Sequence, residues 1–147
     1  MTASTYASIC DNTQSTIHGI ISSDANIVAQ GTKVIDGIPH DLLKGRGTDI
    51  VSVHTPVIYE ELMTRTKYKI IVVTKIEIFA FKEEVCRDLT DFVRASLFNN
   101  LNTTRAARLF RYKCRRSDLA TSDMPTQTGK AAFYTMSLYA EYEYRGD

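Results

Sequence analysis

The sequence predicts a single α+β domain over residues 1–147, with a mixed or mainly antiparallel sheet. The length fits one domain. Two segments have apolar residues three and four positions apart, as amphipathic helices do, and several others alternate polar and apolar residues, as strands do. Their order along the chain, α-β-β-β-α-β-β, places about five strands in one sheet with two main helices packed on one of its faces.

The first predicted element is a helix over residues 4–22, and Ser4 or Thr5 is suited to cap its start. Its apolar stripe consists of Tyr6, Ile9, Thr13, Ile17, Ile20 and Ile21. We expect one short helical turn over residues 24–30 and a brief strand over 32–36. The turn signal Gly37-Ile38-Pro39 ends that strand.

The middle of the chain alternates loops and strands. Residues 40–48 have the composition of a loop, and 49–54 form a second strand that stops at Thr55-Pro56. Residues 57–66 give mixed signals, and we predict a loop with one helical turn at 60–63.

Residues 67–81 are the strongest predicted strand, because they are rich in β-branched and aromatic side chains. One face carries Tyr68, Ile70, Val72, Ile76, Ile78 and Ala80. The other face carries Ile71, Val73, Phe79 and Phe81, together with Lys75 and Glu77. A strand that is apolar on both faces needs two covering layers. We therefore predict that the second face is a subunit interface.

The strongest predicted helix spans residues 83–101. Its buried stripe consists of Val85, Leu89, Phe92, Val93, Leu97 and Leu101. Glu83 and Glu84 suit the positive end of the helix dipole, and Asn residues near position 100 signal its end. After it we predict a strand over 105–116, a polar loop over 117–129 and a long final strand over 130–145.

Composition excludes several classes of protein. The chain has 18 Lys and Arg against 17 Asp and Glu, a net charge of +1, and 44% hydrophobic residues. Ordinary apolar content with little net charge argues against disorder, and it also argues against binding nucleic acid through bulk charge. The N-terminal residues lack the pattern of a secretory signal, and no apolar run is long enough for a membrane span.

The three cysteines, Cys10, Cys86 and Cys114, are far apart and form no CxxC pair. This pattern fits neither a disulfide framework nor a zinc site, and it favours reduced thiols in an intracellular compartment.

The sharpest local signal is a basic segment over residues 105–116. It holds Arg105, Arg108, Arg111, Lys113, Arg115 and Arg116 and no acid, which leaves a net charge of −5 on the other residues. Alternation places Arg111, Lys113 and Arg115 on one strand face, with Phe110, Tyr112 and Cys114 on the other. This face could contact a protein partner or DNA phosphates. Alternatively, it is a solvated face that pairs with Asp118, Asp123, Glu141 and Glu143.

No catalytic or cofactor motif is present. Lys44-Gly45-Arg46-Gly47 lacks the context of a phosphate-binding loop, and His18, His40 and His54 have no metal-ligand spacing. We expect no enzyme activity, metal or cofactor. Two polar loops, at 39–48 and 117–129, are candidates to order against a partner. The residues concerned are His40, Lys44, Arg46, Asp118 and Asp123.

The arrangement resembles the tail terminator (tail completion) proteins of long-tailed bacteriophages. The resemblance lies in the amphipathic first helix and the segments Val34-Ile35-Asp36-Gly37-Ile38-Pro39 and Gly47-Thr48-Asp49-Ile50-Val51-Ser52-Val53. The long strand and helix that follow and the closing strand 131–144 also match. The likeness covers about residues 30–101 and the C-terminal strand.

This resemblance implies a homo-oligomeric ring, usually of six copies, at the end of the tail tube. The ring would stop tube polymerisation and meet the neck or connector protein, and genomic DNA would pass through its lumen without sequence-specific contacts. The sheets of adjacent subunits would form the ring wall, and the protein would be located in the virion tail or neck after assembly in the host cytoplasm. No membrane is involved.

Two other functions are compatible with the sequence. A head–tail connector or stopper protein has a similar size and fold class. A small-ligand-binding domain or a cofactor-free enzyme would instead enclose a pocket between sheet and helix.

Overall fold

A computed structural model of the chain describes residues 5–37, 48–126 and 129–146, with side chains left undescribed at 123–131. The helices are α1 (Tyr6–Ser22), α2 (Ala25–Ala29), α3 (Glu83–Asn99) and α4 (Leu101–Ala106). The strands are β1 (Lys33–Asp36), β2 (Ile50–Val53), β3 (Val57–Leu62), β4 (Tyr68–Ala80), β5 (Leu109–Arg116), β6 (Ala120–Thr126) and β7 (Gly129–Tyr144). The α+β class and the mixed sheet predicted from the sequence are confirmed.

Within the described residues, seven strands form one sheet around β4 and β7. These two long strands pair antiparallel, from Ile70 opposite Tyr144 to Ala80 opposite Tyr134. The other edge of β4 pairs with β3 over residues 68–73 and with β2 over residues 76–79. The other edge of β7 pairs with β6 over residues 129–135 and with β5 over residues 138–144. β1 adds parallel to β2. The two central strands thus hold every other strand in place directly or through one neighbour.

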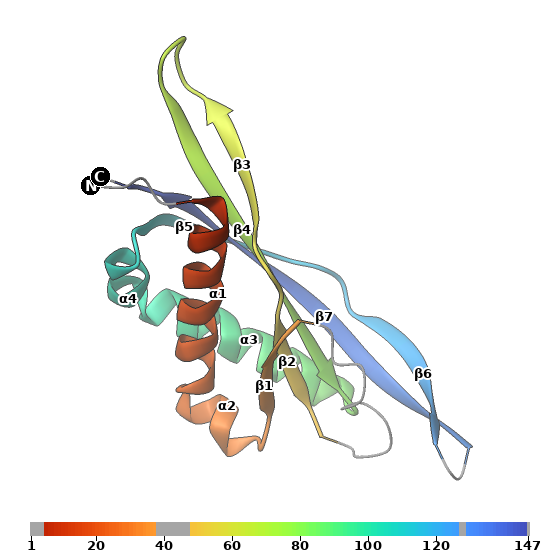
Figure 1. Cartoon of the computed structure of the whole chain (residues 1–147). Helices are drawn as coiled ribbons and strands as arrows, with labels where there is room; N and C mark the ends of the chain where they lie inside the picture. Colours follow the sequence, from red (N-terminus) through yellow and green to blue (C-terminus); the bar gives the residue numbers. More distant parts are fainter. Residues whose placement is uncertain (1–4, 38–47, 127–128, 147) are drawn as a thin grey trace.

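The helices α1 and α3 pack on one face of this sheet, and among the described residues no helix lies on the opposite face (Figure 1). Alternate residues of the central strands face the helices and are buried there; they include Val72, Ile76, Ile78, Leu138, Ala140 and Tyr142. The residues between them face the helix-free side. The predicted arrangement of helices on one face is therefore confirmed.

Helix α1 forms for the reason its sequence suggests. The Thr5 hydroxyl caps it by accepting a hydrogen bond from the Ser8 amide at 3.1 Å. Ile9, Thr13, Ile17, Ile20 and Ile21 are buried on one stripe. Asp24 caps the short helix α2 in the same way, accepting from the amides of residues 26 and 27.

Three predictions about local structure were wrong. Residues 57–62 form β3 rather than a loop, and residues 120–126 form β6 rather than a loop. Residues 101–106 form helix α4, where we predicted the end of the preceding helix at 101 and a strand from 105. β3 is mostly exposed and β6 is polar, so neither has the apolar alternation by which a strand is recognised. Both are the outer strands of hairpins, where the backbone hydrogen bonds to β4 and β7 set the conformation. The sheet consequently has seven described strands instead of about five.

Two hairpins extend the sheet beyond the helical layer in opposite directions (Figure 1). The β3–β4 hairpin projects at one end and the β6–β7 hairpin at the other. The β3–β4 turn is closed by backbone hydrogen bonds from the amides of Met63 and Thr64 to the Lys67 carbonyl, at 2.9 and 3.0 Å. We call residues 57–70 of this hairpin the arm.

Adjacent residues of α3 provide a test of the core. Leu97 is fully buried, whereas the Phe98 side chain is 60% exposed. We expect Leu97→Ala to lower the free energy of unfolding by about 2–5 kcal/mol, because it leaves a cavity. Phe98→Ala is the matched control and should change stability by less than about 0.5 kcal/mol. Denaturant unfolding measures both; equal losses would contradict this packing of α3.

Candidate interaction surface

The helix-free face of the sheet combines apolar and charged side chains. Ile71, Val73 and Phe79 all lie on it, as predicted, since their cross-strand partners are Glu143, Glu141 and Thr135. Phe81 directly follows β4, is half-buried, and donates its amide to the Asp49 carboxylate at 3.2 Å. The face therefore has the apolar content expected of an interface, and no helix in the described part of the chain covers it.

Aromatic and aliphatic side chains on this face pack against each other within the sheet. The Phe79 and Phe133 rings are 6.3 Å apart, centroid to centroid, and inclined at 46°, as in a tilted aromatic pair. Ile71 is only 4% exposed, because Tyr59 and Glu143 flank it on the neighbouring strands. The outer strand β3 adds Val57 and Tyr59, which are 66% and 44% exposed. The least covered part of this face thus lies toward the edge formed by β3.

Two glutamates on this face are each shared by two cationic partners. Glu77 lies 2.7 Å from His54 Nε2 and 3.3 Å from Lys75 Nζ. Glu143 lies 3.5 Å from Arg111 Nε and 3.3 Å from Arg145 Nε. Both glutamate side chains are less than a quarter exposed, so these pairs are screened less than ordinary surface pairs. These ion pairs place polar side chains on the face, and the charges of the two glutamates are neutralised within the subunit.

The basic segment is divided by the fold. Arg105 belongs to helix α4, and Arg108 has a positive φ of 66° just before β5. Arg116 lies on the helix side and reaches Asp91 of α3 at 3.7 Å. Lys113 and Arg115 lie on the helix-free face, opposite Glu141 and Tyr139 of β7. The prediction that residues 105–116 form one continuous strand was wrong.

A bulge in β5 changes which residues share a face. Arg111 has a φ of 55°, and the pairing with β7 shifts between Phe110 and Lys113. An extra residue in one strand offsets the alternation, so Phe110 joins Lys113 and Arg115 on the helix-free face. The predicted separation of Phe110 from these cations was therefore wrong. Tyr112 remains on the helix side, where its ring lies 5.3 Å from that of Tyr142.

Several cations of this region already have partners within the subunit. Arg111 pairs with Glu143, Arg115 lies over the Tyr139 ring at 4.9 Å, and Arg145 lies over Phe110 at 5.0 Å. These contacts favour the alternative in which the basic face is solvated and its cations pair with side chains of β7. Lys113 and Arg115 are nevertheless exposed at the outer strand.

The predicted partner-ordering loops are only partly described. His40, Lys44 and Arg46 lie outside the described residues. Asp118 is exposed in the short connection between β5 and β6, and Asp123 lies in β6 with its side chain outside the description. The loop predicted over 117–129 is thus largely the outer strand of a hairpin.

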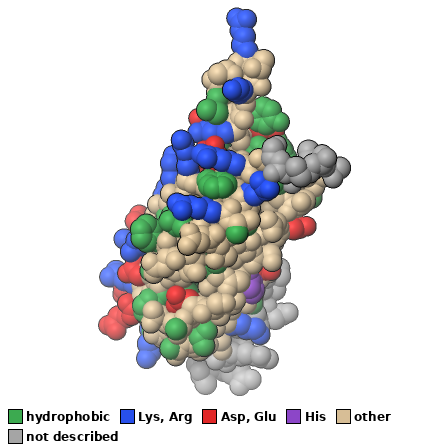
Figure 2. Space-filling model, turned by 90° about the vertical axis from the view of Figure 1, so that its left-hand side faces the viewer, with side chains coloured by type: hydrophobic (Ala, Val, Ile, Leu, Met, Phe, Trp, Pro, Cys, Tyr) green, Lys and Arg blue, Asp and Glu red, His purple; other side chains and the backbone are tan. Residues whose placement is uncertain are grey.

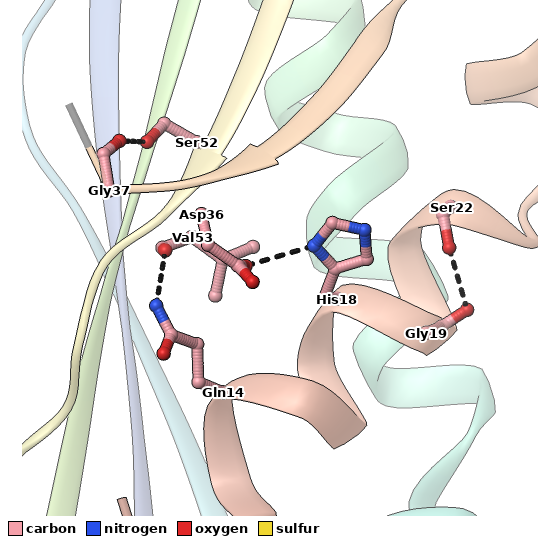
Figure 3. A network of polar contacts seen from close by, with 8 residues as sticks. All are labelled: Gln14, His18, Gly19, Ser22, Asp36, Gly37, Ser52 and Val53. Carbon is pink, nitrogen blue, oxygen red and sulfur yellow. Dashed lines mark hydrogen bonds and ion pairs between the residues drawn. The ribbon is translucent and has the colours of Figure 1, made fainter. Parts of the chain in front are cut away.

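A second polar region joins α1 to the edge of the sheet (Figure 3). Gln14 Nε2 donates to the Val53 carbonyl at 2.9 Å, and His18 Nδ1 lies 2.9 Å from Asp36 Oδ1. The Ser52 hydroxyl donates to the Gly37 carbonyl. Figure 3 shows that these contacts link one turn of α1 to the ends of β1 and β2, which explains why the short strand β1 keeps its place.

A groove of about 720 Å³ lies on the other side of α1, between α1, α2 and α4. Its lining is mixed, with Ile20, Ala106 and Ala107 beside the polar Asn12, Asp24 and Thr103. It was not foreseen from the sequence, because α4 was not predicted and residues 105 and 106 were assigned to a strand. None of the three cysteines lines this groove. Burial raises the pKa of the Cys86 thiol to about 11, which makes that thiol a poor nucleophile at neutral pH.

Within the described part of the chain, no three His, Cys, Asp or Glu side chains gather as metal ligands. No helix among the described residues is long and apolar enough to cross a membrane.

Comparison with known proteins shows the fold. No protein-family profile and no curated protein sequence matches the chain. Among solved structures, the chain is similar to one from the virion of a native gene transfer agent particle, with a TM-score of 0.50 and 17% sequence identity. The match covers 97% of this chain and 100% of the other. The match therefore spans nearly the full length of both chains.

Proposed function

We propose that this protein is a structural component of a phage-like virion, and specifically a tail terminator. Copies of the chain close into a ring, usually of six, that ends the tail tube and meets the neck or connector protein. The role requires no catalysis and no cofactor. Two points support it: the resemblance of the sequence to tail terminators, and a fold shared with a chain of a gene transfer agent virion.

The observation that carries this proposal is a four-stranded antiparallel stretch with two free edges. Its strands are β3, β4, β7 and β5, in that order, and among the described residues no strand pairs with the outer edge of β3 or β5. Free edges expose unpaired backbone groups to which a strand of another chain can add. A second copy of the chain offers such a cover.

Strand direction makes the two edges compatible with a ring. Because four antiparallel strands alternate in direction, β3 and β5 run opposite to each other. A copy rotated about an axis along the strands keeps its strand directions. Its β5 would then lie antiparallel to β3 of the first copy and continue the sheet. Repetition of such a heterologous contact closes into a ring when the rotation fits.

Charge also favours this pairing. β3 carries the exposed pair Glu60 and Glu61 at its outer end, and β5 carries the exposed Lys113 and Arg115. The two edges therefore carry opposite charges, which favours their association. In the ring, the sheets of adjacent copies are continuous, so their helix-free faces form one surface. Val57 and Tyr59 then lie next to side chains of β5 of the neighbouring copy.

Native mass spectrometry and electron microscopy of the purified protein test the proposal directly. We expect closed rings of one size. A protein that stays monomeric over the accessible concentration range, including in the presence of the tube protein, would contradict a tail terminator.

A pair of adjacent substitutions on β4 separates assembly from folding. Val73 is half-buried on the helix-free face beside Val57 and Glu141, whereas Val72 is fully buried under the helices. We expect Val73→Asp to block ring formation more than it lowers the melting temperature, because residue 73 lies on the face predicted to contact a neighbouring copy and, unlike residue 72, keeps contact with water. Val72→Asp, the matched control, should unfold the subunit, because an unpaired charge is then buried in the core. If Val73→Asp melts as early as Val72→Asp, Val73 is a core residue and not an interface residue.

Charge reversal tests the pairing of edges. Lys113→Glu with Arg115→Glu should weaken rings, because the edge formed by β5 then carries charge of the same sign as the edge formed by β3. Adding Glu60→Lys and Glu61→Lys to the same chain should restore them, as measured by native mass spectrometry. Rings that survive the first double substitution but no longer retain DNA would instead show that these cations face the nucleic acid.

A further inference from the structure

The two outer strands β3 and β5 each carry an aromatic side chain on the helix-free face. Tyr59 of β3 is 44% exposed, and Val57 beside it on the same face is 66% exposed. On β5, Phe110 is half-buried and Lys113 is exposed. Tyrosine and phenylalanine are enriched at protein interfaces, and these two lie at the edges through which copies pair in the proposed ring.

Strand pairing within the subunit fixes the level of each of these residues along the sheet. Tyr59 lies opposite Ile71 of β4, which lies opposite Glu143 of β7. Glu143 in turn lies opposite Phe110 of β5. Tyr59 and Phe110 are therefore the two ends of one row of side chains that crosses all four strands.

A second row has Val57 and Lys113 at its ends. Val57 lies opposite Val73, which lies opposite Glu141, and Glu141 lies opposite Lys113. Both rows are on the helix-free face, and the second lies next to the first on that face.

The bulge in β5 is what places both rows on one face. Arg111 and Tyr112 together occupy the space opposite one residue of β7, so Phe110 and Lys113 share a face although they are three positions apart. In a regular strand, residues three positions apart point to opposite faces. The bulge therefore makes the edge of β5 match the regular alternation of Val57 and Tyr59 on β3.

The ring carries these levels over to the neighbouring copy. Rotation about an axis along the strands moves a copy around the ring but leaves the level of each residue unchanged. The two ends of one row then meet at the contact between copies, so Tyr59 faces Phe110 of the next copy. A slip by one residue would bring side chains of opposite faces together, which leaves only slips by two residues as competing registers.

The same register brings opposite charges to one level nearer the tip of the arm. Glu61 lies two positions beyond Tyr59, and Arg108 lies two positions before Phe110. The Arg145 amide donates to the Arg108 carbonyl at 3.0 Å, so the backbone runs along β7 up to this level. Figure 2 shows Lys and Arg side chains gathered below the projecting hairpin, on the side where Figure 1 places α4 and the start of β5. Glu61 of an adjacent copy would lie beside this basic region, which favours the contact.

We propose that β3 of each copy pairs with β5 of the next copy in the register that sets Tyr59 against Phe110 and Val57 against Lys113. This inference rests on the proposed ring, to which it adds the register and the residues of the contact. Within the row, Ile71 is already buried, and Arg145 lies over the Phe110 ring at 5.0 Å. In the closed ring the rows of all copies join into one belt, in which Tyr59 and Phe110 of adjacent copies cover each other.

Disulfide cross-linking tests the register. One chain carries Val57→Cys and Lys113→Cys, with Cys10→Ser and Cys114→Ser to remove the partly exposed native thiols. Within a subunit the two positions are three strand spacings apart, about 14 Å, so a disulfide can form only between copies. We expect mild oxidation of assembled protein to give a ladder of linked copies on a denaturing gel. A chain with only one of the two cysteines should give none.

The matched control shifts one cysteine by two positions on the same face. In the proposed register, residue 57 and residue 115 of the next copy are diagonal neighbours about 7–8 Å apart, beyond the reach of most disulfides. Val57→Cys with Arg115→Cys in the same background should therefore lose the ladder. Native mass spectrometry under reducing conditions measures whether both variants form rings.

A double-mutant cycle on the aromatic pair is the second measurement. Tyr59→Ala and Phe110→Ala should each weaken association, and their combined effect should fall short of the product of the two by about 2- to 12-fold per contact, the range for an aromatic pair. The same cycle with Phe98→Ala in place of Phe110→Ala should show no coupling. Independent effects of Tyr59→Ala and Phe110→Ala would overturn the contact, whether or not the cysteine variants assemble.

The outcomes separate this inference from the proposed function. Rings linked through residues 57 and 113 support both. Rings linked through residues 57 and 115, or through neither pair, overturn this register and leave the ring standing. Absence of rings from the unmodified chain overturns the tail terminator and the register together.

Discussion

The pairing of β4 with β7 is the constraint on which the rest of the structure depends. Eleven consecutive residue pairs join these strands. Each of the two strands then offers its second edge to two further strands, and one common face to the helices α1 and α3. Both projecting hairpins are continuations of the same pair beyond the helical layer (Figure 1). A change that shifted this register by one residue would turn Val72, Ile76 and Leu138 away from the helices and expose the core.

Sequence patterns predicted this core well, because burial there follows simple periods. The stripe of α1, the stripe of α3 and the two faces of β4 were all apparent from residues such as Ile17, Leu89 and Val72. The same reasoning failed at the edges. β3 and β6 owe their conformation to backbone pairing with β4 and β7 across the hairpin turns, and an exposed strand with Glu60 and Glu61 has no apolar alternation to reveal it.

The candidate site was predicted only in part, for a related reason. The apolar face of β4 was recognised because it lies within one strand. The groove beside α4 and the arm could not be recognised, since they depend on how α4 and β3 are placed by tertiary contacts. The bulge at Arg111 also escaped prediction, because a positive φ at an arginine has no sequence signature and is fixed by pairing with β7. Charge counting found the basic segment but not its division between helix and strand.

The position of β7 along the chain has a consequence for the life of the protein in a cell. Residue 70 pairs with residue 144, so the centre of the sheet joins segments separated by half the chain. Contacts of such long sequence separation form late, because loop closure must precede them. During synthesis, β4 and the helices are therefore exposed to solvent before the ribosome delivers their central partner. Chaperone protection would be needed most in that interval, and a prematurely terminated product would lack the middle of its sheet and leave its core open to proteolysis.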